Sequence, residues 1–402
     1  MMMSHGPYDV LARLAATGTP PDGPQALRLS VGLDKTLKLL EAETFPFLAG
    51  GGAEVRFIYA PYGRGKTHLL LTLQEAARRH GLITAYIDCQ AENAPFASLE
   101  QTYRQIAQNL QLPHPLSDNS RRRGVDTLVA GVIEQFAGNQ TGLQDRMQQL
   151  RRASRLTTDF RNTVLAYGRS LLHDHLGDLR QELRSLLCHE IATSITITSI
   201  YRRYGWVPRP LGKMTKRTAP LWLRSLLSLP LVLGYPGCCI FFDETEKTLT
   251  KLYRRDRQLY WANLRNLADH LALGSIQGCA LIFAVVEEFL EEAQIDLDAL
   301  SQRLERPRLP IEQRLPNPRA LWVDIDELTY PGPDTSEFFQ LLAERLLDLG
   351  REAGLAEAQI ERLRDPLYTL AMQAANSIRT GAVRDFVKET ASRIVTALSI
   401  GT

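Results

Sequence analysis

EVRFIYAPYGRGKTHLL, residues 54–70, is the stretch that decides the fold. Its first half is apolar enough for a buried strand, and a helix over residues 66–79 begins at Lys66. The glycines at 63 and 65 let the backbone curl so that successive N–H groups face inward and hold phosphate oxygens. LITAYIDC, residues 82–89, then predicts a second strand. A strand, loop, helix and strand in this order open a parallel α/β sheet.

The loop itself is the predicted phosphate site, and the start of the helix adds the positive end of its dipole. We expect Lys66 to reach the β- and γ-phosphates of ATP and the Thr67 hydroxyl to sit on Mg²⁺. The usual pattern is GxxxxGK[ST], and the small residue Ala60 stands at its first position. The alternative is a glycine-rich turn with a chance Gly-Lys-Thr. The expected nucleotide-binding residues are Tyr62, Gly63, Arg64, Gly65, Lys66, Thr67 and His68.

CCIFFDE, residues 238–244, predicts a strand buried on both faces that ends in two carboxylates. The carboxyl ends of such strands are where α/β sheets place their ligands. We expect Asp243 to hold Mg²⁺ through water and Glu244 to polarise the attacking water as a general base. The alternative is a strand followed by an acidic helix N-cap.

Two arginines are candidates to complete the site. Arg384 opens a C-terminal helix, from which it can reach the γ-phosphate from the side. Arg303 follows the predicted strand CALIFAVV, residues 279–286, where the nucleotide of a neighbouring subunit is expected. Arg306 and Arg314 are alternatives for the arginine donated across the interface. For each arginine the other reading is a solvated helix residue. His68 is expected to be a helix contact rather than a base.

Composition is that of an ordinary globular protein. The 402 residues are 44% hydrophobic and 23% charged, which allows more than one packing unit. The net charge of +2 means that any nucleic-acid surface must be local. Prolines break the longest apolar stretch, residues 219–242, so no membrane span is expected. The five cysteines form no CxxC pair and predict buried free thiols in the cytoplasm, without a zinc site.

Periodicity divides the chain into four parts. We expect a helical leader over residues 1–50, an ATPase core over 51–90 and 236–330, a helical insertion over 91–235 and a helical lid over 331–402. The leader contains a second helix over residues 34–43 after a Pro/Gly-rich break at 17–24. LWVDID, residues 321–326, is the last expected strand, and IATSITITSI, residues 191–200, is ambiguous.

Residues 201–217 of the insertion are the candidate nucleic-acid contact. They contain no acidic residue and interleave Tyr204 and Trp206 with cations. The cations would neutralise phosphates and the aromatic rings would stack on bases. A solvated helix face or a protein contact is the alternative. The candidate cations are Arg202, Arg203, Arg209, Lys213, Lys216 and Arg217.

Four segments together resemble a known family: residues 16–43, 56–70, 83–88 and 221–247. In this order they are similar to the P-loop proteins of bacterial BREX phage-defence systems, the BrxC/BrxD type, and the length is similar to the short BrxD-like members. The leader and the LGYPG segment before the DE strand make the match specific. The resemblance implies an AAA+-like P-loop NTPase fold with a parallel sheet, a large helical insertion and a C-terminal helical lid. It also implies an ATPase distantly related to origin-recognition and STAND ATPases, with a helicase or other defence-system proteins as candidate partners.

Two classes of function stay open. One is an ATP-driven motor or switch that acts on DNA. The other is a nucleotide-gated scaffold that assembles with protein partners without gripping DNA, because ATP bound at a subunit interface favours the associated state. Either class predicts a homo-oligomer. A kinase on the same core is disfavoured, because nothing indicates a pocket for a small-molecule acceptor.

Overall fold

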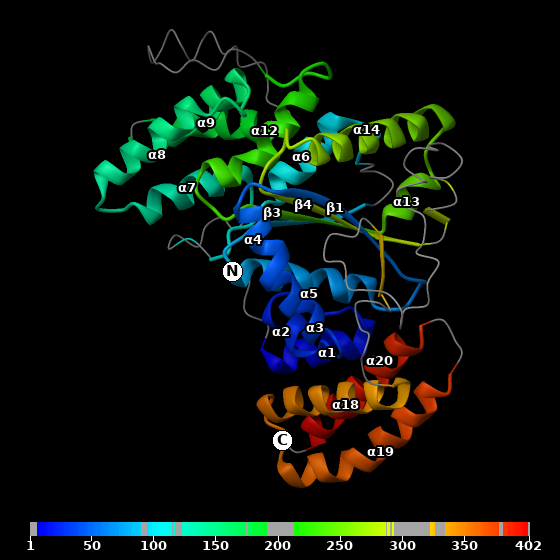
Figure 1. Cartoon of the computed structure of the whole chain (residues 1–402). Helices are drawn as coiled ribbons and strands as arrows, with labels where there is room; N and C mark the ends of the chain where they lie inside the picture. Colours follow the sequence, from blue (N-terminus) through cyan, green and yellow to red (C-terminus); the bar gives the residue numbers. More distant parts are fainter. Residues whose placement is uncertain are drawn as a thin grey trace.

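The computed structural model describes residues 6–89, 95–114, 116, 123–173, 176–190, 213–286, 288–289, 292, 322–325, 334–377 and 381–400. A parallel sheet lies in the middle of the molecule (Figure 1). Helices of the insertion lie above the sheet in that view, and the leader and the C-terminal helices lie below it.

The sheet has five parallel strands in the order β2-β3-β4-β1-β5. Their bounds are β1 Ala53–Tyr59, β2 Ile83–Asp88, β3 Cys238–Asp243, β4 Cys279–Val285 and β5 Trp322–Asp324. β3 and β4 are buried along their whole length, as expected for apolar runs covered on both faces. β2, β3, β4 and β5 lie within their predicted runs, and β1 begins one residue before its run. The predicted α/β fold class with a parallel sheet is confirmed.

One face of the sheet packs against α6 (Leu99–Asn109), α12 (Ala219–Val232) and α14 (Arg254–Ala272). The rings of Phe242 and Phe283 stack at 4.6 Å between their centroids. The insertion continues the same core through α7 (Val125–Gln135), α8 (Gln140–Arg152), α9 (Thr158–Leu171) and α10 (Gly177–Leu187). The ambiguous run at 191–200 lies outside the described residues.

The other face packs against α5 (Lys66–Arg79), which has the predicted bounds, and against the end of the leader. The leader corrects one expectation, because the helix predicted over residues 34–43 is α3 (Asp34–Leu39) followed by the π-helical turn η1 (Leu40–Thr44) and α4 (Phe45–Ala49). The helical conformation continues through all three, and only the hydrogen-bond pattern changes at η1, just before Pro46, which has no N–H to donate to the helical ladder. A short helix α2 (Pro24–Arg28) also begins at the end of the predicted Pro/Gly-rich break, with its proline at the first position.

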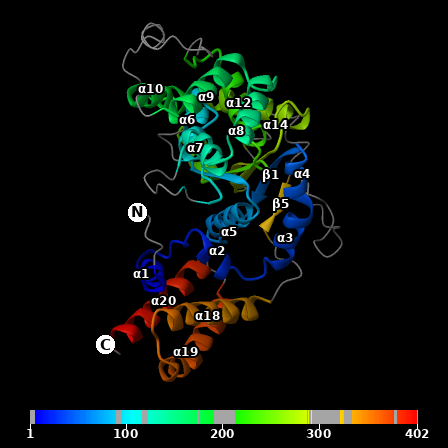
Figure 2. The same ribbon diagram turned by 90° about the vertical axis from the view of Figure 1, so that its left-hand side faces the viewer.

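The first helix of the leader packs with the far end of the chain. α1 (Pro7–Thr17) lies against α20 (Ala382–Ile400), and both share a core with α18 (Thr335–Glu352) and α19 (Glu357–Ala375). Figure 2 shows α1 beside the three C-terminal helices. We call α18, α19 and α20 the lid. The first part of the leader and the lid therefore form a third hydrophobic cluster, separate from the two cores that flank the sheet.

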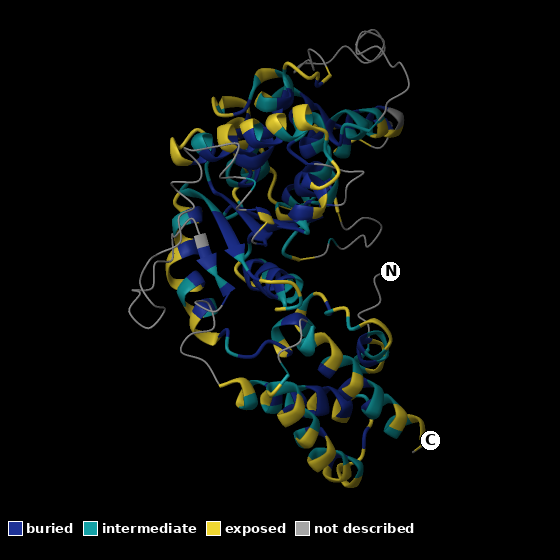
Figure 3. Ribbon diagram, turned by 90° about the vertical axis from the view of Figure 1, so that its right-hand side faces the viewer, coloured by how far each residue is buried: buried dark blue, intermediate teal, exposed yellow. Residues whose placement is uncertain are grey.

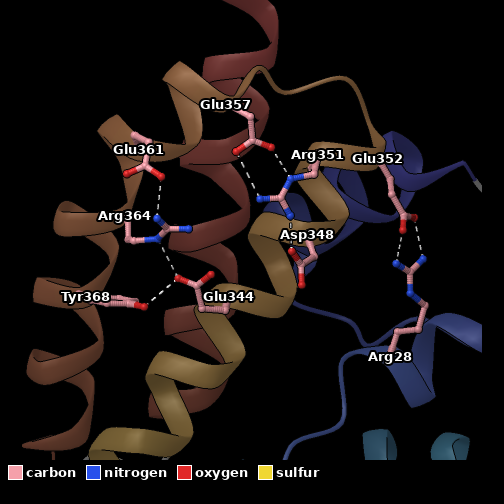
Figure 4. Close-up of polar contacts among 9 residues, drawn as sticks. All are labelled: Arg28, Glu344, Asp348, Arg351, Glu352, Glu357, Glu361, Arg364 and Tyr368. Atoms are coloured by element: carbon pink, nitrogen blue, oxygen red, sulfur yellow. Dashed lines mark hydrogen bonds and ion pairs between the residues drawn. The ribbon is translucent and has the colours of Figure 1, made fainter.

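Polar contacts tie the leader to the lid (Figure 4). Arg28 at the end of α2 forms a bidentate ion pair with Glu352, with Nη1 donating to Oε2 at 2.7 Å. Arg345 donates to the backbone carbonyl of Arg28 at 2.9 Å. A half-exposed ion pair contributes only about 0–1 kcal/mol to stability. The contacts of Arg28 therefore orient the lid more than they stabilise the fold.

Burial follows this division of the molecule. Figure 3 shows buried residues in the sheet and on the helix faces that meet it, whereas the outward faces of the lid helices are exposed. Within the described ranges, every helix is too short or too polar to cross a membrane.

Two backbone segments come close together just before the central strands β3 and β4 begin. Gly237, just before β3, has φ 126°, and a Cβ added to it would lie 2.5 Å from the carbonyl oxygen of Gly278, just before β4. That carbonyl accepts the N–H of Cys238 at 2.7 Å, so it is held in place. We expect Gly237→Ala to lower the free energy of unfolding by about 2–4 kcal/mol.

Gly274→Ala is the matched control for this prediction. Gly274 has φ 70° and nothing within 4 Å of an added Cβ, so only the left-handed backbone opposes alanine there. We expect a loss of roughly 1 kcal/mol, measured by urea unfolding beside the first variant. Equal losses for the two variants would show that the approach to Gly278 is not the constraint.

Candidate phosphate site

The predicted loop lines one cavity of about 510 Å³ at the carboxyl ends of the strands. All seven predicted nucleotide-binding residues, 62–68, belong to its wall. Gly63 and Gly65 have φ 78° and 87°, the left-handed region that glycine enters without a steric penalty. The structure therefore brings the loop and the start of α5 together around a single space.

Lys66 is held by groups that a phosphate can replace. Its side chain is buried, and its Nζ donates to the carbonyl oxygens of Ala60 at 3.0 Å and Pro61 at 3.4 Å. Nζ also lies 4.8 Å from the ring centroid of Tyr62. Burial lowers the pKa of Lys66, while the carboxylates of Glu246, Asp243 and Glu244 oppose that shift. Two neutral carbonyl oxygens thus hold the ammonium group of Lys66 at the loop.

Asp243 is the polar centre of the site. It is 3% exposed, and its Oδ2 accepts the Thr67 hydroxyl at 2.7 Å and the Tyr86 hydroxyl at 2.6 Å. Its Oδ1 accepts the backbone N–H of Glu244 at 2.9 Å. Thr67 and Asp243 meet as the sequence predicts, whereas sequence reasoning missed Tyr86. Tyr86 lies on β2, opposite Phe241 in the register of β3, and only the strand order reveals this placement.

The Thr67 and Asp243 oxygens fit a Mg²⁺ ion. Magnesium prefers oxygen ligands, keeps several waters and is bound through one or two protein groups together with substrate phosphates. A hydroxyl and a carboxylate oxygen 2.7 Å apart beside Lys66 offer that kind of set. Among the residues with described placement, no cluster of three or more His, Cys, Asp or Glu forms a metal cage. All five cysteines are free and buried, as predicted.

Glu244 is positioned by the short helix α13 (Thr245–Leu249). Thr245 donates to the carbonyl of Ala284 at the end of β4 at 2.9 Å, and Thr248 donates to the carbonyl of Cys89 after β2 at 3.0 Å. Glu244 itself has φ 55°, a left-handed conformation that is uncommon for glutamate and typical of strained functional positions. Its Oε1 lies 3.1 Å from the Nζ of Lys247. The predicted base thus lines the cavity while a lysine holds its carboxylate.

Glu246 is a buried acid that sequence reasoning missed. It is 4% exposed, and neither carboxylate oxygen has a hydrogen-bond partner in the described structure. Burial raises its pKa, and the nearby Lys66 opposes this shift. In the sequence it looks like an ordinary acid of the first helical turn, so no signal distinguished it from a solvated residue.

The far end of the cavity is apolar and comes from the leader and the lid. Leu29 and Val31 approach it from the leader, and Phe338 and Leu342 approach it from α18. Arg384 of α20 also lines the cavity, and a Cβ added at Gly18 would lie 2.7 Å from its Cγ. A space with a cationic, hydrogen-bonding end and an apolar end matches the phosphates and the base of a nucleotide.

The remaining predicted residues fall into two groups. Arg303, Arg202, Arg203 and Arg209 lie outside the described residues. Lys213, Lys216 and Arg217 are exposed just before α12. Lys213 and Lys216 line a separate cavity of about 400 Å³ whose wall also includes Glu100 and Glu190. The described end of the basic stretch therefore faces carboxylates as well as solvent.

Comparison with protein families identifies the chain. The family described as BREX system ATP-binding protein BrxC/D matches residues 7–398, so the chain belongs to this family and the resemblance seen in the sequence is confirmed. Comparisons with curated proteins and with solved structures gave no match. The family description assigns ATP as the bound nucleotide, which agrees with the two-ended cavity.

His68 links the phosphate site to the leader. Its Nε2 lies 3.0 Å from the Oγ of Ser30, which is also 2.7 Å from the hydroxyl of Thr72. Burial, aided by the charge of Arg345, lowers the pKa of His68 from 6.5 to about 4. Between these values the unfolded chain binds a proton that the folded chain does not, so stability falls as pH drops through this window.

We therefore expect the parent protein to lose about 2 kcal/mol more stability than His68→Gln when the pH falls from roughly 7.5 to 5. Urea unfolding of both proteins at the two pH values measures the difference, and the other titrating groups cancel in the comparison. Parallel pH dependence of the two proteins would contradict a buried neutral His68.

Proposed function

We propose that this member of the BrxC/D family is a Mg²⁺-dependent ATPase of a bacterial defence system, acting in the cytoplasm on or with DNA. One observation carries the proposal: Lys66, the Thr67–Asp243 pair and Glu244 meet at the polar end of a cavity whose other end is apolar. In a single space, these groups would bind the phosphates, hold the metal and activate the attacking water, and the apolar end would bind the nucleobase.

Each side chain has a distinct role in the proposal. Lys66 leaves its carbonyl partners and contacts the β- and γ-phosphates, beside the inward-facing N–H groups of the loop. Thr67 and Asp243 would hold Mg²⁺, which neutralises charge on the phosphate oxygens. Tyr86 and the N–H of Glu244 orient the Asp243 carboxylate.

Glu244 is the proposed general base. It takes a proton from a water molecule whose oxygen bonds to the γ-phosphorus, while the bond from that phosphorus to the β-phosphate oxygen breaks. ADP and phosphate are the products. For this step the carboxylate must turn from Lys247 toward the phosphates, because the ion pair now occupies one of its oxygens.

Assembly is the second candidate function, and the cavity wall supports it. A nucleotide there would contact the sheet on one side and the joined leader and lid on the other, so binding can change how these two units sit together. We include a homo-oligomer, and association with a helicase or other defence-system proteins, in the proposal. Arg303 remains a candidate for donation across such an interface.

The assigned roles predict different defects for two variants. Lys66→Ala should lose ATP binding, whereas Glu244→Gln should bind ATP normally and hydrolyse it at least about a hundredfold more slowly. ATP titration and phosphate release, each with and without double-stranded DNA, measure both effects. Turnover at the parent rate by Glu244→Gln would refute the assigned base.

Particle mass measured in parallel separates the two candidate functions. DNA stimulation of a Glu244-dependent rate supports action on DNA. A rate that ignores DNA, together with a mass that changes with ATP, supports the assembly switch.

Arg384 provides a further prediction. Because it lines the cavity from the lid, Arg384→Ala should weaken ATP binding by about tenfold while leaving ADP binding nearly unchanged. Lys388→Ala is the matched control, since Lys388 lies one turn further along α20, also near Gly18, but not in the cavity wall. Equal loss of ATP and ADP affinity in Arg384→Ala would argue against contact with the γ-phosphate.

A further inference from the structure

The segment that follows β3 carries a cluster of exposed cations that lie close in the sequence to an exposed aromatic ring. Tyr253, between α13 and α14, is 83% exposed, and the cations on both sides of it are exposed as well. We call this cluster the α13–α14 surface. Its members are Lys247, Lys251, Tyr253, Arg254 and Arg255.

Three of these cations have no carboxylate partner among the residues that the structure describes. Lys251, Arg254 and Arg255 form no ion pair in the described part of the chain, while Arg257 just beyond them pairs with Glu292 at 3.8 Å. In the lid, by contrast, Arg351 and Arg364 are each held by two carboxylates (Figure 4). Positive charge on the α13–α14 surface is thus left for an anion outside the chain.

The same residues are a poor choice for starting a helix. Arg254 and Arg255 occupy the first turn of α14, where they add positive charge to the positive end of the helix dipole. The N-cap is Tyr253, which makes no side-chain cap hydrogen bond, although Ser, Thr, Asp or Asn would. Only Asp256 in that turn favours the dipole. A sequence shaped for helix stability alone would place other residues here.

One member of the surface reaches the phosphate site. Lys247 pairs with Glu244 at 3.1 Å, and the two side chains are 56% and 32% exposed. Contact with Glu244 raises the pKa of Lys247, so the ammonium form is favoured. An ion pair this exposed is weak and exchangeable. A phosphate that attracts Lys247 therefore competes directly with the proposed base.

We propose that the α13–α14 surface binds the phosphate backbone of DNA, with Tyr253 stacking on a base, and that this contact draws Lys247 away from Glu244. This inference rests on the proposed ATPase function, and it makes DNA the activator of ATP hydrolysis. An exposed aromatic ring flanked by cations is the combination that recognises nucleic-acid strands. DNA binding frees the Glu244 carboxylate to turn toward the attacking water. Hydrolysis is thereby coupled to DNA through Lys247, which lies one helical turn after Glu244.

Fluorescence anisotropy with a labelled single-stranded oligonucleotide, titrated over salt, tests the surface. Arg254→Ala/Arg255→Ala should reduce the slope of log affinity against log salt by about 1.4, because two phosphate contacts are lost. Tyr253→Ala should weaken binding by about tenfold without changing that slope. Arg362→Ala is the control, since Arg362 is exposed on α19 and forms no ion pair within the described residues.

If both α13–α14 variants bind DNA with the affinity and the salt slope of the parent protein, the proposal is overturned. The same holds if only Lys213→Ala/Lys216→Ala/Arg217→Ala weakens binding, or if polyglutamate binds in place of DNA. Unfolding midpoints close to the parent value show that each variant is folded.

Phosphate release, measured with and without the same single-stranded oligonucleotide, tests the coupling to Glu244. Lys247→Ala should raise the DNA-free rate by about two- to fivefold, the range expected for loss of an exposed ion pair, and should abolish further stimulation by DNA. Lys247→Arg should restore parent behaviour. A Lys247→Ala protein with the parent's DNA-free rate and full stimulation would overturn the coupling. If the parent hydrolyses no ATP with or without DNA, the proposed function fails, and the anisotropy data alone decide whether the surface binds DNA.

Discussion

The Asp243 carboxylate is the constraint on which the site depends. A buried carboxylate is stable only when it is well hydrogen-bonded, and this one accepts donors from three separate elements. Thr67 comes from α5, Tyr86 from β2 and the N–H of Glu244 from the start of α13. Satisfying one charge therefore aligns the phosphate loop, the neighbouring strand and the helix that carries the proposed base.

The second constraint is the joining of the two chain ends. α1 and α20 share one hydrophobic core with α18 and α19, and the ion pair of Arg28 with Glu352 ties the leader to the end of α18 (Figures 2 and 4). Because the apolar wall of the cavity belongs to this unit, the sheet alone offers only the phosphate end of a nucleotide site. The apolar end is lined mainly where residues from the leader and the lid fold together, so a nucleotide bound as proposed would be sensitive to the lid.

Local features of the site could be predicted from the sequence, and contacts between distant elements could not. The Gly-Lys-Thr loop and the DE pair follow from short motifs, and the sheet places them at one edge as expected. Tyr86 and Glu246 gave no signal, because their places depend on strand order and on packing around α13. The π-helical turn at η1 and the continuation of this helix into α4 were also missed.

Two groups proposed for catalysis, Lys66 and Glu244, share a further property: each is held by a partner that it must leave. Lys66 bonds to loop carbonyls, and Glu244 pairs with Lys247. Neutral acceptors and exposed ion pairs hold these groups weakly, whereas a nucleotide triphosphate with its metal offers several concentrated charges. The fold therefore spends its strong, buried contacts on aligning the site and leaves the reacting groups in weak ones. In the proposed mechanism, such a division would keep the site assembled but inactive until nucleotide and an activating contact arrive together.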